Sequence, residues 1–104
     1  MAWVRRVYEL SKVLPDSERF GLISQMQRAA VSVPANIAEG ANRLHKGDFL
    51  RHISFALGSL AEAETLIQLA IDLQYVSADR CTDLLEKSDQ IGRMLRGLQK
   101  SLAK

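Results

Sequence analysis

The chain has 104 residues, of which 47% are apolar and 25% charged, and a formal net charge of +2 from 14 basic and 12 acidic residues. This balance is typical of one globular domain with one core, here residues 1–104, and it argues against disorder. The net charge is too small to require a nucleic-acid partner, although a local basic patch is compatible with one.

The cellular compartment is indicated by the absence of a cysteine pair, a signal peptide and a membrane span. Cys81 is the only cysteine, so no intrachain disulfide can form. The first ten residues are amphipathic and basic, which is unlike a signal peptide. The most apolar stretch is interrupted by Glu62, Glu64 and Asp72, which excludes a membrane span. We therefore expect a cytoplasmic protein with no membrane partner.

The first half of the chain shows two segments with the apolar period of a helix. The first runs over Trp3–Leu14 and is ended by Pro15. The second runs from Glu18 to Asn42 and carries Pro34 in its interior, where proline removes one backbone hydrogen bond. We expect a kink near Ala30–Pro34, with a true break as the alternative.

A ladder of polar side chains follows one side of this second helix. At roughly 100° per residue, its members lie within an arc of about 80°. If the helix kinks, Ser32 or Asn36 is expected to bond the freed backbone groups. The ladder is compatible with a structural network or subunit contact, a solvated face, or a ligand or nucleic-acid site. The structural interpretation is favoured, because charged networks are often structural. The ladder consists of Arg28, Ser32, Asn36, Glu39 and Arg43.

The third predicted helix, Asp48–Gln74, has two apolar stripes, with Asp48 as its expected N-cap. One stripe suits the core of the chain. The second implies another surface to pack against, which we interpret as an oligomer interface. Glu64 lies at the edge of the main stripe and would need a cationic partner if buried, for which Arg28 or Arg43 is the candidate. The second stripe consists of Phe55, Leu66, Leu69 and Leu73.

The fourth predicted helix starts after Ser77, its expected cap, and continues to the C-terminus. Its apolar positions are spaced as a heptad seam, with acidic residues in the early turns and basic residues in the late turns. Four helices with short connections predict an all-α, up-down-up-down antiparallel four-helix bundle.

Basic residues near the two ends of the chain are candidates for phosphate contacts. No aromatic residue is interleaved with the C-terminal cations, so binding there would be salt-sensitive and only weakly sequence-specific. The alternative is a solubilising helix end stabilised by the helix dipole. The candidate nucleic-acid residues are Arg5, Arg6, Arg93, Arg96 and Lys100.

Metal and catalytic motifs are not indicated. His45 and His52 are seven residues apart, too far for the one-turn pairing of helical metal sites. Thr65 stands where a histidine would complete a Glu-x-x-His motif with Glu62. Cys81 has no base nearby in the sequence and is interpreted as packing. We predict no metal, no cofactor and no enzymatic activity.

Two blocks, N-I-A-E-G at 36–40 and G-S-L-A-E-A-E-T at 58–65, give the sequence a recognisable appearance. With V-Y-E-L at 7–10, they resemble the four-helix bundle proteins encoded within intervening sequences of bacterial 23S ribosomal RNA genes. The resemblance extends from about Val7 to Leu102. It implies a bundle that assembles as a ring-like homopentamer, and a relationship to the basic accessory protein of diversity-generating retroelements, which works with RNA.

Carried over by matching motif positions, the family's polar set includes both the ladder and part of the third helix. The first helix starts later than in typical members, so one end of the bundle is expected to be less covered. The third-helix members of the polar set are Gly58, Ser59, Glu62, Glu64 and Thr65.

Two functional hypotheses follow. The first is a non-enzymatic homo-oligomer, a pentamer by resemblance, that binds RNA or DNA through basic surface residues. The alternative is a structural scaffold that binds a protein partner without nucleic acid.

Overall fold

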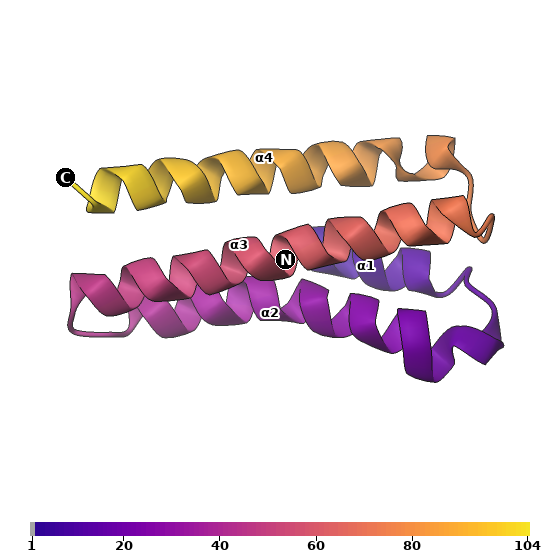
Figure 1. Ribbon diagram of the computed structural model, residues 1–104, viewed down its shortest axis with the longest axis horizontal. Helices are drawn as coiled ribbons and strands as arrows, with labels where there is room; N and C mark the ends of the chain where they lie inside the picture. Colours follow the sequence, from indigo (N-terminus) through magenta and orange to yellow (C-terminus); the bar gives the residue numbers. More distant parts are fainter. Residues whose placement is uncertain (1) are drawn as a thin grey trace.

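Four antiparallel α-helices make up the bundle in this computed structural model, which describes residues 2–104 (Figure 1). Successive helices run in alternate directions along a body of 44 × 24 × 19 Å. No strand occurs among the described residues, so the prediction of an all-α four-helix bundle is confirmed. The helices are α1 (Ala2–Ser11), α2 (Ser24–Ala41), α3 (Lys46–Asp72) and α4 (Ala78–Leu102).

The apolar stripes of all four helices meet in one core. Val7 of α1, Met26 and Val33 of α2, and Ile53 of α3 have no exposed surface. From α4, Cys81 packs into the same core, where burial raises the pKa of its thiol and so disfavours the reactive thiolate. None of the helices in residues 2–104 combines the length and apolar composition that crossing a membrane demands.

The connection between α1 and α2 differs from the prediction. Instead of a helix that starts at Glu18, the chain forms a 3₁₀ turn (Asp16–Glu18) and a π-helical turn (Arg19–Ile23) before α2. The Glu18 carboxylate accepts a hydrogen bond from the backbone N–H of Leu22 at 3.3 Å and another from the Tyr75 hydroxyl at 2.9 Å. Glu18 therefore caps the wide turn and ties it to the α3–α4 connection, a tertiary contact that local periodicity does not report.

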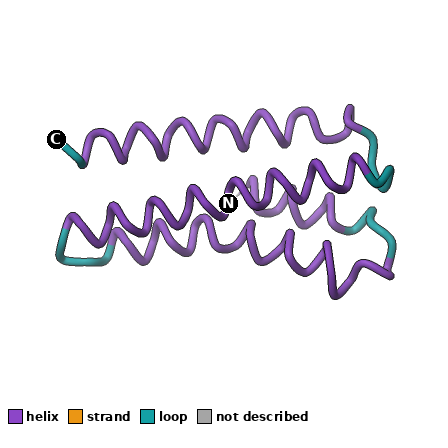
Figure 2. The backbone as a smooth tube through the Cα atoms, viewed as in Figure 1, coloured by secondary structure: helices purple, strands orange, loops and turns teal. Residues whose placement is uncertain are grey.

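The other helix ends lie close to their expected positions. α1 ends before Leu14, which still packs in the core. α3 begins at Lys46, so Asp48 is not the N-cap but lies in the first turn, where it forms an ion pair with Arg51 at 3.2 Å. The predicted cap of α4 is confirmed, since the Ser77 hydroxyl accepts a hydrogen bond from the first turn. The short α2–α3 loop is teal in Figure 2.

Pro34 does not break its helix, since α2 is continuous through it. Proline has no N–H, so the carbonyl of Ala30 loses its usual intrahelical donor. The Asn36 amide donates to the carbonyl of Ser32 at 2.9 Å and not to that of Ala30. Of the two side chains expected to bond the freed carbonyl of a kinked helix, Ser32 and Asn36, the Asn36 side chain does not do so and takes part in contacts with α3 instead.

Helix α1 covers only one half of the bundle, and its N-terminus lies near the middle (Figure 1). The Trp3 indole N–H donates to the Ser88 hydroxyl at 2.7 Å, in a buried contact with α4. Arg6 forms an ion pair with Asp83 near the start of α4. The second half of α4 has no such cover from α1, and there Met94 is 73% exposed.

Candidate interaction surfaces

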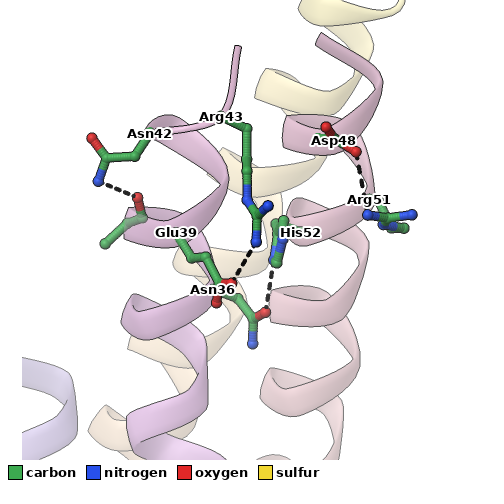
Figure 3. A network of polar contacts seen from close by, with 8 residues as sticks. Asn36, Glu39, Asn42, Arg43, Asp48, Arg51 and His52 are labelled. Atoms are coloured by element: carbon green, nitrogen blue, oxygen red, sulfur yellow. Dashed lines mark hydrogen bonds and ion pairs between the residues drawn. The ribbon is translucent and has the colours of Figure 1, made fainter. Parts of the chain in front are cut away.

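A chain of hydrogen bonds crosses from α2 to α3, and we call its four residues the polar seam: Ser32, Asn36, His52 and Ser59. The Asn36 amide nitrogen donates to the Ser32 hydroxyl at 2.9 Å, and the Ser59 hydroxyl donates to the same oxygen at 2.8 Å. The Asn36 amide oxygen lies 3.1 Å from Nδ1 of His52 (Figure 3). Since this oxygen can only accept, Nδ1 of His52 must carry the proton.

The close approach of the two helices at the polar seam depends on Gly40. A Cβ on Gly40 would lie 2.7 Å from Cβ of His52, closer than real atoms pack, and 3.0 Å from the Phe49 ring, a tight contact. His52 is only 7% exposed. Sequence reasoning weighed His52 only as a metal ligand and missed this role. A usable signal was present, because Ser59 follows His52 by one heptad and therefore shares its helix face.

The predicted ladder divides into an inner and an outer part. Ser32 and Asn36 are half-buried between the helices. Arg43 forms an ion pair with Glu39 one turn earlier on α2, at 2.7 Å, and both side chains are exposed (Figure 3). Arg28 is exposed beside Ser32 in a shallow hollow between α1 and α2. The structure thus brings the short polar residues into contact with α3 and leaves the charged ones on the surface.

Of the third-helix members of the predicted polar set, Ser59 joins the polar seam, whereas Glu62, Glu64 and Thr65 do not. Glu62 is exposed, and the exposed Thr65 hydroxyl donates to a carbonyl of its own helix at 3.0 Å. Glu64 is half-buried on the side of α3 that faces α4. Burial raises the pKa of its carboxyl, the charge of Asp89 raises this pKa further, and Arg96 opposes both. The expected partner of Glu64 on α2 is therefore wrong, because α4 supplies the charges around it.

The predicted oligomer interface is an exposed apolar strip on α3, with one exception. Phe55 is 51% exposed, Leu69 43% and Leu73 53%. Leu66 is only 6% exposed and belongs to the core of the chain. Leu66 precedes Leu69 by three residues, so their side chains point about 60° apart around the helix axis. We name Phe55, Leu69 and Leu73 the α3 apolar strip.

Charge is divided between the two halves of the bundle. We call residues 34–58 and 91–104 the basic half: they hold seven Lys or Arg against two Asp or Glu, a net charge of +5. The remaining described residues, 2–33 and 59–90, hold seven Lys or Arg against ten Asp or Glu, a net charge of −3. The basic half is the half that α1 leaves uncovered (Figure 1). A net charge of only +2 thus hides a strong asymmetry.

Two exposed hydrogen bonds join α3 and α4 in the basic half. The Lys46 ammonium donates to the backbone oxygen of Lys104 at 3.2 Å, and the Gln99 amide donates to the Ser54 hydroxyl at 3.1 Å. The C-terminus of α4 therefore lies beside the first turns of α3. In the described chain, Arg96 and Lys100 have no carboxylate within ion-pair distance.

The predicted nucleic-acid residues do not form one patch. Arg93, Arg96 and Lys100 lie in the basic half, although Arg93 forms an ion pair with Asp89 at 3.0 Å. Arg5 and Arg6 lie on α1 in the other half, and Arg6 is held by its carboxylate partner on α4. Helices α1 and α4 meet at the N-terminal half of α4, which keeps both α1 arginines away from the C-terminal cations.

The described residues, 2–104, contain no group of three or more His, Cys, Asp or Glu side chains arranged to hold a metal ion. The fold and these surfaces define a four-helix bundle whose polar features are helix–helix contacts and an asymmetric surface charge. The chain belongs to the 23S rRNA-intervening sequence protein family, whose model matches residues 1–97. The family resemblance of the quoted motifs is therefore confirmed.

A solved structure has the same fold. It is the crystal structure of a protein with unknown function from the S23 ribosomal protein family of Bacteroides thetaiotaomicron VPI-5482. The two chains are 25% identical and superpose with a TM-score of 0.87, over 95% of this chain and 93% of that chain. No curated protein matches the sequence. Family and neighbour together define the bundle, and neither carries an assigned biochemical activity.

Proposed function

We propose that this protein is a non-enzymatic homo-oligomer that binds RNA or DNA by its phosphates through the basic half. The observation that carries the proposal is the separation of charge, +5 in the basic half against −3 elsewhere. A phosphate backbone is attracted to a concentrated positive surface more than to the same charge spread evenly. Arg96 and Lys100 are the best-placed contacts, because no ion pair in the described chain occupies them.

Self-assembly is the second part of the proposal, and the α3 apolar strip supports it. Three large apolar side chains at 43% exposure or more, on one face of one helix, are expected to pack against another surface. A symmetric assembly would repeat the basic half once per copy and so multiply its field. The number five, and a role with RNA like that of the retroelement accessory protein, rest on the resemblance alone.

The proposal is tested by fluorescence anisotropy with a labelled structured RNA and a matched DNA duplex, titrated across salt. Affinity should fall steeply as salt rises. A variant with Arg96, Lys100 and Lys104 changed to Glu should lose binding, whereas Arg5, Lys12 and Arg19 changed to Glu should retain most of it. The two variants carry the same net charge, so the comparison isolates position. No binding at low salt, or equal loss in both variants, would refute phosphate binding by the basic half.

A further inference from the structure

An open groove runs between the second half of α3 and the first half of α4, and only Arg93 at its end belongs to the basic half. Its volume is about 670 Å³. Ile71 and Leu85, both half-buried, supply apolar surface, and Glu86 and Asp89 lie on the α4 side. A groove with an apolar floor and a charged rim has the form that amphipathic helices occupy in helix-in-groove recognition.

The surroundings of this groove are strongly acidic. Residues 62–93, which form the two helix segments around it, hold seven Asp or Glu against three cations, a net charge of −4. Of these three cations only Arg93 lines the groove. Arg80 lines a separate hollow with residues of α1, and Lys87 acts on Asp83, the carboxylate that pairs with α1.

Arg93 lines the end of the groove towards the C-terminus. Its positive charge is neutralised by an ion pair with Asp89. Glu64 stands next to that pair on α3, and Asp89 is close enough to raise the pKa of its carboxyl. The free charge along the groove is therefore negative. Such a surface repels nucleic acid and attracts a cationic partner.

We infer that this groove binds a cationic amphipathic helix of a partner protein. Lining residues extend on α4 from Ala78 to Arg93, a length of about 22 Å at the helical rise, which fits a partner helix of about four turns. Apolar side chains on one face of that helix pack on Ile71 and Leu85, and flanking Lys or Arg side chains meet Glu86, a lining carboxylate that forms no ion pair in the described chain. The inference goes beyond the proposed function, since groove and basic half have opposite charge and can be occupied together.

The test uses the full chain and a fluorescein-labelled 15-residue peptide of Leu and Lys, with leucines at helical spacing. A peptide of the same composition with the leucines scattered round the helix is the control. The amphipathic peptide should bind at least roughly tenfold more tightly, because only it presents an apolar face to the floor. Equal binding of the two peptides, or no binding of the amphipathic one, would overturn the inference.

Two variants locate the binding on the protein. Glu86→Lys should weaken binding of the amphipathic peptide by roughly tenfold, because it puts a like charge on the rim. Glu9→Lys makes the same change of charge on an exposed position of α1, outside the groove, and should have little effect. Equal weakening by both would mean general attraction to an acidic protein and would contradict the inference.

Occupation of the groove by a second copy of this chain is a separate outcome of the same variants. In that case Glu86→Lys would lower the native mass of the assembly, and the groove would be an interface between copies and not a partner site. An unchanged native mass together with weaker peptide binding supports the inference. RNA binding in Glu86→Lys should persist, so that failure here is distinguishable from failure of the proposed function.

Discussion

The Asn36 amide oxygen of α2 lies 3.1 Å from Nδ1 of His52 on α3, and this contact sets the tautomer of the His52 ring. The amide nitrogen donates to the backbone carbonyl of Ser32, which can only accept, so the amide oxygen must face His52. One side chain thus satisfies a group on its own helix and one on the next. No buried side-chain nitrogen or oxygen lacks a partner in residues 2–104.

The first prediction concerns this shared role of Asn36. Asn36→Ala leaves Nδ1 of the buried His52 without its partner, whereas the Ser32 hydroxyl keeps its bond from Ser59, so the free energy of unfolding should fall by about 1–3 kcal/mol. Asn42→Ala is the matched control, because its exposed amide bonds only to a carbonyl of its own helix, and its effect should stay within about 0.5 kcal/mol. Urea unfolding of both variants decides the matter. Equal midpoints would show that the polar seam adds no stability.

The second prediction concerns the approach of α2 and α3. Gly40→Ala places a methyl group 2.7 Å from Cβ of His52, so the helices must shift, at a cost of about 1–3 kcal/mol. Gly58→Ala is the control. Nothing lies within 4 Å of its added Cβ, and alanine should stabilise α3 by about 0.5–1 kcal/mol. Thermal unfolding should move in opposite directions for the two variants; a shift of the same sign would contradict the packing argument.

The third prediction concerns the α3 apolar strip. Phe55→Asp and Leu69→Asp should each lower the native mass measured by light scattering while the helical circular dichroism is retained, because both side chains are exposed in the single chain. Leu66→Asp should unfold the protein, since Leu66 lies in the core. Met94→Asp, at an exposed position of α4, is the control and should change neither quantity. An unchanged mass in both strip variants would place the interface elsewhere.

The fold followed from periodicity because each helix buries one stripe, and such a stripe is visible in the order of residues. The helix ends were less predictable where a distant residue decides them. Glu18 caps the π-helical turn partly because Tyr75, remote in sequence, holds its carboxylate. Arg6 and Asp83, which form an ion pair, are equally far apart in the sequence. This pair occupies Arg6, one of the cations predicted to contact phosphate.

The candidate site was predicted in part, and the errors share one cause. Periodicity gives the angle of a side chain round its helix but not which neighbour it meets. Glu64 was correctly placed at the edge of the core, yet it faces α4 and not α2. Leu66 and Leu69 were predicted to lie in one stripe, but the small angle between them around the helix places Leu66 in the core and Leu69 on the surface. The separation of charge between the halves was also missed, because it appears only when α2, α3 and α4 are aligned.

The last prediction follows from the raised pKa of Glu64. In the unfolded chain its carboxyl has an ordinary pKa near 4.5, and burial and Asp89 raise the pKa in the folded state. The folded state therefore binds this proton more tightly, and stability is lost as pH rises from the ordinary pKa through the raised one. Glu64→Gln removes this loss. It should stabilise the protein at about pH 7.5, by less than about 1 kcal/mol because the side chain is partly exposed, and change little at about pH 3.

Thermal unfolding of wild type and Glu64→Gln at both pH values measures the difference. Glu62→Gln is the control. It removes the same charge from an exposed side chain two residues earlier. Its effect should stay within about 0.5 kcal/mol at either pH. A gain in Glu64→Gln that persists at low pH would assign the effect to packing and not to the proton. Destabilisation at neutral pH would mean that attraction to Arg96 outweighs burial.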